Sequence, residues 1–350
     1  MTVLHWDFGS AYDFFISLFV IHYPDRFGLR GAWAAGVRSR FSPEERVFIE
    51  NTINFLPVPL SWVNRLSLSD KSTGEVLQLL SAIPPEKRLI ALFNSSQLEK
   101  KVISSVERIQ SEQKITVEDL EILRSIYQHR AIPIKMRDVQ KLAEAFLEPA
   151  QFGENLLNVL QSYYQAFFAE EEERILPSLR KGLQFAQKLS KKTSLPDLLE
   201  TLSHGVKLEN TDIYQKVILV PSYWSSPLVF FNNPRADELL VVFGCRNETQ
   251  NLVPGEYVPE SLVTGLKALA DPTRLRILHY LNQGTTTPSS LARRLRLRAP
   301  TVIHHLNTLR LAGLVQVTLT GNGERRYSLR QEAINDTFTQ LTAVIKSDTT

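Results

Sequence analysis

The chain has 350 residues, of which 43% are hydrophobic and 22% are charged, and its net charge is +3. This length excludes a single small module and suits two domains, and the composition is that of a soluble globular protein with a large core. The single cysteine, Cys245, excludes an intrachain disulfide framework and fits a reducing cytoplasm.

The N-terminal segment MTVLHWDFGSAYDFFISLFVI is apolar and predicts a strand followed by a buried helix. No Lys or Arg precedes its apolar run, and Asp7 and Asp13 interrupt it, so we do not expect a secretory signal peptide. No uncharged stretch approaches the roughly 20 residues that a membrane-spanning helix needs. We therefore expect a cytoplasmic protein without a membrane partner.

A mainly helical pattern runs from about Ser10 to His204. Hydrophobic periodicity predicts helices at Pro43–Phe55, Glu86–Arg108, Val117–His129, Arg137–Phe146, Phe152–Ala169 and Glu171–Ser190. The acidic run AEEEE, at 169–173, is interpreted as a solvated helix face or a junction.

The pattern changes between Asp212 and Arg246. The runs DIYQKVILVP, SPLVFF and ELLVVFGC are short, rich in Val, Ile, Leu and Phe, and bounded by Pro, Asn and Gly, which predicts antiparallel strands joined by tight turns. Two prolines and a glycine in Asn251–Glu260 predict a linker. We therefore expect a mainly helical α+β protein. Its N-terminal domain would cover 1–255, helical to about 205 with a small antiparallel sheet at about 212–246, and its C-terminal domain would cover 256–350.

The C-terminal domain has repeated helix-start signals. Ser261 can cap a first helix that runs to Ala270, and Asp271 and Thr287 each precede a proline, which is the pattern of a capped helix with proline at its first position. A further helix begins at Ala299. Core positions follow the spacing of one helix face, namely Leu275, Ile277, Leu278, Leu281, Leu291, Ala292, Leu295, Val302, Leu306 and Leu309.

A hairpin follows these helices. The segment VQVTLTGNGERRYSL turns at Gly321-Asn322-Gly323, residues that tolerate positive φ, and places Arg325 and Arg326 beside the tip. Helix, helix, turn, helix and hairpin in this order predict a winged helix-turn-helix, which places one helix in the major groove of DNA. The distribution of charge agrees with DNA binding, because residues 261–350 hold 12 Lys and Arg against 5 Asp and Glu. Since the net charge of the whole chain is only +3, the rest of the chain is acidic.

The outward side of the last of these helices is the expected reader of DNA. Candidate base-contacting residues are Thr301, His304 and Asn307, whose side chains can donate or accept hydrogen bonds in the groove. Candidate phosphate contacts are Arg293, Arg294, Arg296, Arg298, His305, Arg310, Arg325 and Arg326. Taken separately, the basic run RRLRLR could be only a solvated helix end, and the hairpin only a structural ribbon. Their agreement in order favours DNA binding.

Residues 268–329 resemble the DNA-binding domain of ArsR-type transcriptional regulators. The similarity rests on ALADPTRLRILHYL, on SLARRLRLRAPTVIHHLNTLRLAGLV and on the closing RRYSL. The resemblance implies a homodimeric repressor that binds an inverted repeat of double-stranded DNA, with the helices flanking the reader forming the dimer contact. The apolar stripe of the last helix agrees with this. The expected dimerisation residues are Leu262, Leu266, Ile334, Phe338, Leu341 and Ile345.

The chain departs from this family in two ways. Metal sensors of the family carry cysteines on the helix that corresponds to Pro288–Leu295, or His and Asp ligands on the last helix. This chain has PSSLARRL there and no His or Cys after His305, so we expect no metal and no cofactor. The family also often has Gly and Ser where Arg296 and Arg298 stand, and a small or polar residue at Ile303, which favours stronger phosphate contact here.

The N-terminal region is harder to interpret. YPDRFGLRGAWAAGVRSRFSPEE and VILVPSYWSSPLVFF are similar to segments of a long ArsR-type subgroup with an uncharacterised N-terminal domain, which implies no ligand. Tyr223, Trp224, Phe230 and Phe231 could line an apolar pocket, although core packing is the simpler interpretation. We expect a transcriptional regulator that is not an enzyme, whose N-terminal domain either senses an unidentified effector, a small molecule or a protein, or widens the dimer interface. The alternative is an enzyme or protein-interaction module that the winged helix only localises.

Overall fold

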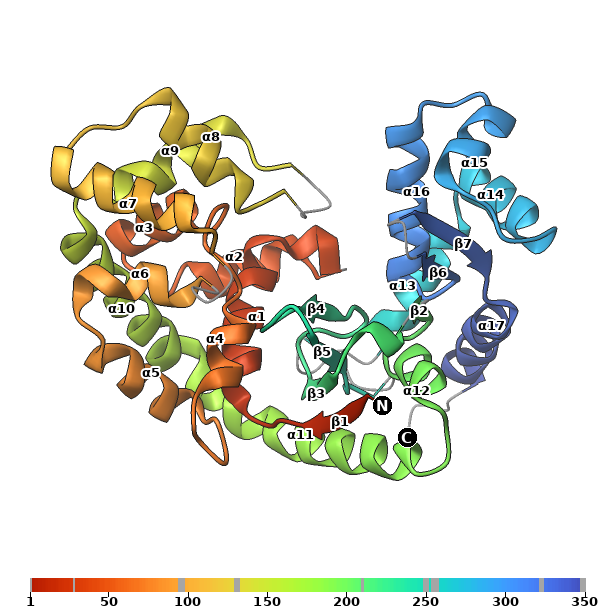
Figure 1. The fold of residues 1–350 in the computed structure, drawn as a ribbon. Coiled ribbons are helices and arrows are strands. Elements are labelled where there is room, and N and C mark those ends of the chain that lie inside the picture. The colour runs from red at the N-terminus through yellow and green to blue at the C-terminus, as the bar shows by residue number, and fades with distance from the viewer. Residues whose placement is uncertain are drawn as a thin grey trace.

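A computed structural model gives the fold of the chain. The residues that it describes are 2–27, 29–93, 98–128, 133–208, 211–247, 252, 258–320 and 324–346. A helical lobe, a central sheet and a group of C-terminal elements follow one another across the molecule (Figure 1). The mainly helical α+β class expected from the sequence is confirmed. Among the described residues, no helix is long and apolar enough to cross a membrane.

The helical lobe is built from short amphipathic helices around a buried first helix. Its elements are α1 (Ser10–His22), η1 (Pro24–Phe27), α2 (Gly31–Arg38), α3 (Pro43–Thr52), α4 (Leu60–Arg65), α5 (Thr73–Ala82), α6 (Pro85–Leu92), α7 (Lys100–Glu112), α8 (Val117–Ser125), α9 (Met136–Ala145) and α10 (Pro149–Tyr163). The predicted helix Glu86–Arg108 is wrong as a single helix, because α6 ends at Leu92 and α7 begins at Lys100. The polar run NSSQ between Phe93 and Leu98 interrupts the apolar spacing at this point, and it is the signal that the single-helix prediction did not use.

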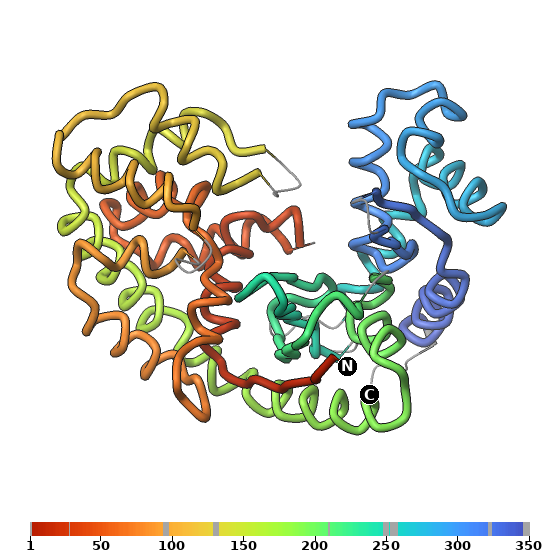
Figure 2. The backbone as a smooth tube through the Cα atoms, in the orientation of Figure 1, coloured from red at the N-terminus to blue at the C-terminus, as the bar shows by residue number. Residues whose placement is uncertain are grey.

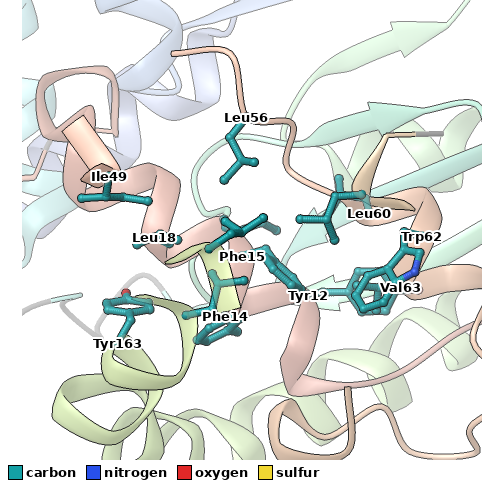
Figure 3. Packing of buried hydrophobic residues seen from close by; sticks show 14 of the residues in the cluster. Tyr12, Phe14, Phe15, Leu18, Ile49, Leu56, Leu60, Trp62, Val63 and Tyr163 are labelled. Carbon is teal, nitrogen blue, oxygen red and sulfur yellow. The ribbon is translucent and has the colours of Figure 1, made fainter. Parts of the chain in front are cut away.

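The helix α1 explains the apolar N-terminus. It follows the strand β1 (Val3–Trp6), and almost every one of its side chains is buried. Figure 3 shows Phe14, Phe15 and Leu18 of this helix packed among side chains from α3, α4 and α10, including Trp62 and Tyr163. A helix that is apolar all round is expected at the centre of a large core, as observed here.

The central sheet has the strand order β1-β3-β5-β4, with β3 (Lys216–Ser222), β4 (Phe230–Asn232) and β5 (Glu238–Gly244). The expectation of an antiparallel sheet is wrong for most of it. The strands β1, β3 and β5 are parallel, and only β4 runs antiparallel to its neighbour β5. The burial of the strands explains the parallel arrangement. Both faces of β3 and β5 are buried, which is typical of parallel strands that other elements cover on two sides.

Two different cores cover the two faces of this sheet. Ile218, Val220, Leu240 and Val242 point into the core of the helical lobe. The alternate residues of β3 and β5 pack instead against α11 (Ala169–Ser190) and α12 (Leu195–Leu202), through a second cluster. Since successive side chains of a strand point to opposite faces, seven-residue runs of apolar residues supply both layers. Tyr223 and Trp224 are buried in the lobe core, which supports the core-packing interpretation of this aromatic cluster.

A continuous helical rod connects the lobe to the far side of the sheet. The helix α10 passes through one π-helical turn, η2 (Tyr164–Phe168), directly into α11. Figure 2 shows this rod descending along the lobe and then passing beneath the sheet. The two helices predicted at 152–169 and 171–190 are therefore parts of one rod, and Pro177 is accommodated inside α11.

The acidic run at 169–173 is not simply a solvated face. Glu171 is only 7% exposed, where it accepts hydrogen bonds from the Arg174 guanidinium and from Trp224 Nε1 at 2.9 Å. Asp13 is fully buried nearby and accepts hydrogen bonds from Ser222 Oγ and the Trp224 amide, both at 2.7 Å. Burial raises the pKa of Asp13 to about 7, although these hydrogen bonds oppose the shift. These carboxylates join the rod and α1 to the carboxyl end of β3.

Close packing of α10 on α6 gives a first prediction. A Cβ atom at Gly153 would lie 1.9 Å from the Pro85 carbonyl oxygen, so Gly153→Ala must push the two helices apart. We expect it to lower the free energy of unfolding by about 1–3 kcal/mol, measured by thermal or urea unfolding. The matched control is Gly74→Ala in α5, where a Cβ has ample space and the variant should be stabilised by about 0.5–1 kcal/mol. Equal stability of the two variants would contradict this packing.

Candidate nucleic-acid interface

The C-terminal elements form a winged helix-turn-helix. They are α13 (Glu260–Leu269), α14 (Pro272–Asn282), α15 (Pro288–Leu295), α16 (Ala299–Leu311), β6 (Val315–Leu319), β7 (Arg325–Leu329) and α17 (Gln331–Lys346). Two expected caps are present, because Asp271 accepts a hydrogen bond from the Arg274 amide at 2.8 Å and Thr287 from the Ser290 amide at 3.3 Å. Ser261 is not a cap, since α13 begins one residue earlier, after Pro259.

The apolar residues predicted from their helical spacing to be buried form the core between these helices. Buried members are Ile277, Leu278, Leu281, Leu291, Ala292, Leu295, Val302, Leu306 and Leu309. Leu275 is the exception, with half of its surface exposed, because it lies off the face that Ile277, Leu278 and Leu281 share. The core therefore fixes α16 against α14 and leaves the opposite face of α16 open.

That open face carries the predicted base-contacting residues. Thr301, His304 and Asn307 are all exposed and repeat every three residues, so they lie along one side of α16 beginning at its first turn. Ile303 beside them is 42% exposed. This face can offer hydroxyl, imidazole and amide groups to a ligand, together with one apolar contact.

His305 lies elsewhere than expected. Its side chain is only 15% exposed, and its Nδ1 lies 4.0 Å from Asp271 Oδ1 at the start of α14. Burial lowers the pKa of His305, with Asp271 acting in the opposite direction. One residue turns a helix by about 100°, so the neighbour of an outward His304 points to the flank. We therefore leave His305 out of the candidate phosphate contacts.

The turn between α15 and α16 is strongly cationic. Arg293, Arg294, Arg296 and Arg298 are all exposed, and within the described part of the chain none of them lies within 4 Å of a carboxylate. Arg296 closes α15 in a left-handed conformation, with φ 56° and ψ 43°. Such a conformation favours glycine, so this chain places an arginine where the backbone prefers a residue without a side chain.

The hairpin adds a second cationic edge. Strands β6 and β7 are antiparallel, and Arg325 and Arg326 at the start of β7 are exposed. Arg326 Nε lies 3.1 Å from Glu324 Oε2, which partly compensates its charge. The predicted turn Gly321-Asn322-Gly323 lies outside the described residues. Arg310 is half-buried near Tyr327, and this burial lowers its pKa, so it is a less available phosphate contact than Arg325.

A strand from the N-terminal region joins this hairpin. The three-residue strand β2 (Val206–Leu208) runs parallel to β6, and the sheet order is β2-β6-β7. Val206 is buried in the winged-helix core opposite Val317. The approach of β2 is fixed by left-handed residues, His204 and Gly205, and by the Arg330 guanidinium, which donates to the His204 carbonyl at 3.1 Å. The sequence reasoning missed β2, whose only signal is a turn followed by one alternation, Val-Lys-Leu.

The helices α13 and α17 pack together at the edge of the module, where Gly265 lies against Thr337. Of the predicted dimerisation residues, Leu262 is 1% exposed and Ile334 packs on the winged-helix core. Phe338 and Ile345 are 53% and 73% exposed. The face that remains open to a partner is therefore the Phe338–Ile345 side of α17, with the half-buried Leu266 and Leu341 beside it.

No group of three or more His, Cys, Asp or Glu side chains suited to holding a metal ion occurs among the described residues. Glu332 and Asp336, which lie one turn apart on α17, are both exposed. The placement of these two carboxylates agrees with a solvated helix face.

A family model matches part of this region, and two kinds of relative are similar to the chain over a short length. Residues 271–317, from the cap of α14 into β6, match the model of the family described as bacterial regulatory protein, arsR family. The chain is 40% identical over 79 residues to the HTH-type transcriptional regulator CmtR of Mycobacterium tuberculosis, a match that covers 23% of this chain and 66% of CmtR. It is 39% identical over 49 residues to the transcriptional repressor SdpR of Bacillus subtilis, covering 14% of this chain and 54% of SdpR. The chain thus spans just under two thirds of the first relative and about half of the second.

The left-handed conformation of Arg296 gives a second prediction. Arg296→Gly should raise the free energy of unfolding of the winged helix by up to about 1 kcal/mol, because it removes the Cβ from a left-handed position. Arg293→Gly inside α15 removes the same charge from a right-handed helical position and should lower stability by about 1 kcal/mol. Thermal unfolding monitored by a probe in the winged helix would measure both, and the same sign for both variants would contradict the strain at Arg296.

Proposed function

We propose that this chain, whose C-terminal region belongs to the ArsR family of bacterial regulatory proteins, is a sequence-specific DNA-binding transcriptional regulator that acts as a repressor. The observation that carries this proposal is the exposed side of α16, which presents Thr301, His304 and Asn307. These side chains lie beside a cationic turn whose arginines have no carboxylate within 4 Å among the residues that the structure describes. Polar side chains at the start of a helix flanked by arginines suit a major groove between two phosphate backbones.

Each group of residues has a distinct role in this proposal. Thr301 and His304 contact base edges, and Asn307 reaches an adjacent base. The arginines of the turn contact phosphates on one side of the groove, and Arg325 on the hairpin contacts a phosphate or the minor groove on the other. Phosphate contacts set affinity and its salt dependence, whereas base contacts set sequence preference, so the two sets can be separated by experiment.

We further infer that the functional unit is a homodimer formed through α17. Phe338 and Ile345 expose large apolar surfaces on one side of this helix, and a second copy is a suitable cover for them. A two-fold dimer would present two copies of α16 to an inverted repeat whose half-sites lie about one helical turn apart.

The N-terminal region is proposed to sense an effector in the cytoplasm rather than to catalyse a reaction. The family match at 271–317 and the relatives described as transcriptional regulators support regulation by the whole chain, and an input domain is a suitable companion to such a module. Its route to DNA would be β2, because this strand is hydrogen-bonded to the same β6 that carries the hairpin. An effector changes operator affinity only by binding the DNA-competent and DNA-incompetent states with different affinities. A shift of β2 would be one structural difference between these states, because it would displace the hairpin with which β2 is paired.

DNA binding gives the third prediction. In a gel shift at about 150 mM salt, the full chain should bind the DNA upstream of its own gene more tightly than a random duplex of equal length. Thr301→Ala and His304→Ala should each cost about 1–3 kcal/mol on that DNA and relax the preference for it. Arg325→Ala should weaken binding to all duplexes and reduce the slope of log affinity against log salt by about 1.

Arg180→Ala is the control for these variants, because Arg180 is an exposed arginine of α11 in the N-terminal region. It should leave both the affinity and the salt slope unchanged. Binding of wild-type protein to upstream and random DNA with equal affinity would overturn sequence-specific regulation. An unchanged preference in the Thr301 and His304 variants would remove these residues from base recognition.

The dimer gives the fourth prediction. Phe338→Lys should shift the protein toward monomer by at least about tenfold in dissociation constant, because a charge would enter the proposed apolar contact. Analytical ultracentrifugation measures this shift, and the folded state should survive because Phe338 is 53% exposed in the single chain. Ile213→Lys is the control at another exposed apolar position, 66% exposed, outside α17. A dimer that resists Phe338→Lys would place the contact elsewhere.

A further inference from the structure

A groove in the helical lobe has the size and lining of a small-molecule site. It lies between α3, α9 and α10, and its volume is about 340 Å³. Binding sites for small molecules occupy roughly 300–1,000 Å³ and combine apolar walls with a few polar groups. The groove is remote in the fold from α16, so the winged helix does not supply its lining.

The apolar part of the groove is a wall of three phenylalanine rings. The ring centroids of Phe48 and Phe152 are 5.2 Å apart, and those of Phe55 and Phe152 are 6.2 Å apart. Phe55 is 1% exposed and forms the buried end, whereas Phe48 and Phe152 are half-buried. Rings that already meet at tilted angles can accept another flat ring by offset or edge-to-face contact, so this wall favours an aromatic ligand.

The polar part of the groove is acidic. Glu144 and Glu148 line it from the end of α9 and the start of α10, and both are exposed. Neither forms an ion pair with a cation among the described residues. The one cation of the lining, Lys141, donates from its Nζ to Asn51 Oδ1 at 2.6 Å. Asn51 holds the ammonium in place but does not neutralise it, so the lining has two carboxylates against one cation and remains acidic. Glu144 Oε1 accepts a hydrogen bond from Gln140 Nε2 at 3.2 Å, which leaves the charge of this carboxylate in place. A ligand that carries positive charge would therefore meet two carboxylates without a cationic partner among the described residues, and the negative faces of the phenylalanine rings.

We propose that this groove binds a small, flat aromatic cation. The ring of the ligand stacks on Phe48 and Phe152, and its positive charge lies toward Glu144 and Glu148. Assigning this ligand as the effector of the regulator rests on the proposed function, whereas the binding site itself does not.

The position of the groove gives such a ligand a route to the hairpin. Phe152 lies in the first turn of α10, which continues through η2 into α11 as one rod. The helix α12 packs against α11, and β2 follows α12 directly along the chain and pairs with β6. A tilt of α10 caused by a ligand would therefore be carried along this rod to the strand that holds the hairpin.

The test uses the full-length protein without DNA and two probes that share one ring system. N-methylacridinium is permanently cationic, whereas acridine is uncharged at neutral pH. Fluorescence titration should give N-methylacridinium an affinity at least about tenfold higher than that of acridine, as expected for two partly exposed charge contacts and a cation over aromatic rings. Equal affinities, or binding of neither probe, would overturn the proposal.

Variants locate the site. Glu144→Gln together with Glu148→Gln should weaken the cation about tenfold and leave acridine unchanged, since both side chains are exposed and the fold does not depend on them. Glu107→Gln, an exposed carboxylate of α7 outside the groove, should bind both probes as the wild type does. If the double variant matches this control, the cation binds elsewhere and the assignment fails. Because no DNA is present, this result is independent of whether the chain regulates transcription.

Discussion

The pairing of β2 with β6 is the constraint on which the arrangement of the two halves depends. Three residues of the N-terminal region complete the sheet of the winged helix, with Val206 in its core and Arg330 anchored to the His204 carbonyl. The edge strand of a hairpin offers unpaired amides and carbonyls, and here a strand of the same chain occupies them. As a result, the hairpin that is proposed to contact DNA cannot shift without strain at β2 and α12. The N-terminal region and the proposed DNA-contacting surface are thereby joined through one shared sheet.

In the cationic turn, Arg296 lowers folding stability but adds positive charge. Arg296 occupies a left-handed position where glycine would be more stable, by about 1 kcal/mol, and it stands among three further exposed arginines. Strain of this kind persists where the surrounding structure holds it, and it is often found at functional sites. Each cation placed against a phosphate releases a counterion, so a strained arginine at a DNA backbone can contribute more to binding than it costs in folding. This is a physical reason for an arginine rather than a glycine at this turn.

The sequence predicted the winged helix well because its signals are local. Asp271 and Thr287 each combine a cap with a following proline, and apolar residues three and four apart locate the buried faces. Features that depend on residues distant in the sequence were not predicted. The direction of strands buried on both faces carries no local signal, and the three-residue β2 is stabilised by β6, more than a hundred residues away. Residue type predicts His305 on the surface and Glu171 on a solvated face or at a junction. In the fold His305 is half-buried, and Glu171 is buried where it accepts a hydrogen bond from Trp224 of a distant segment. The proposed ligand groove carries no local signal either, because its lining comes from three separate helices.

The central claim is that two copies of this chain read a defined DNA sequence through α16. The most direct measurement is selection of bound duplexes from a random DNA library by the purified full-length protein, followed by sequencing. We predict enrichment of an inverted repeat whose half-site centres lie about one helical turn apart, lost in the Thr301→Ala, His304→Ala double variant. Recovery of duplexes without any enriched sequence, while binding remains salt-dependent, would contradict sequence-specific regulation and leave only a phosphate-binding module.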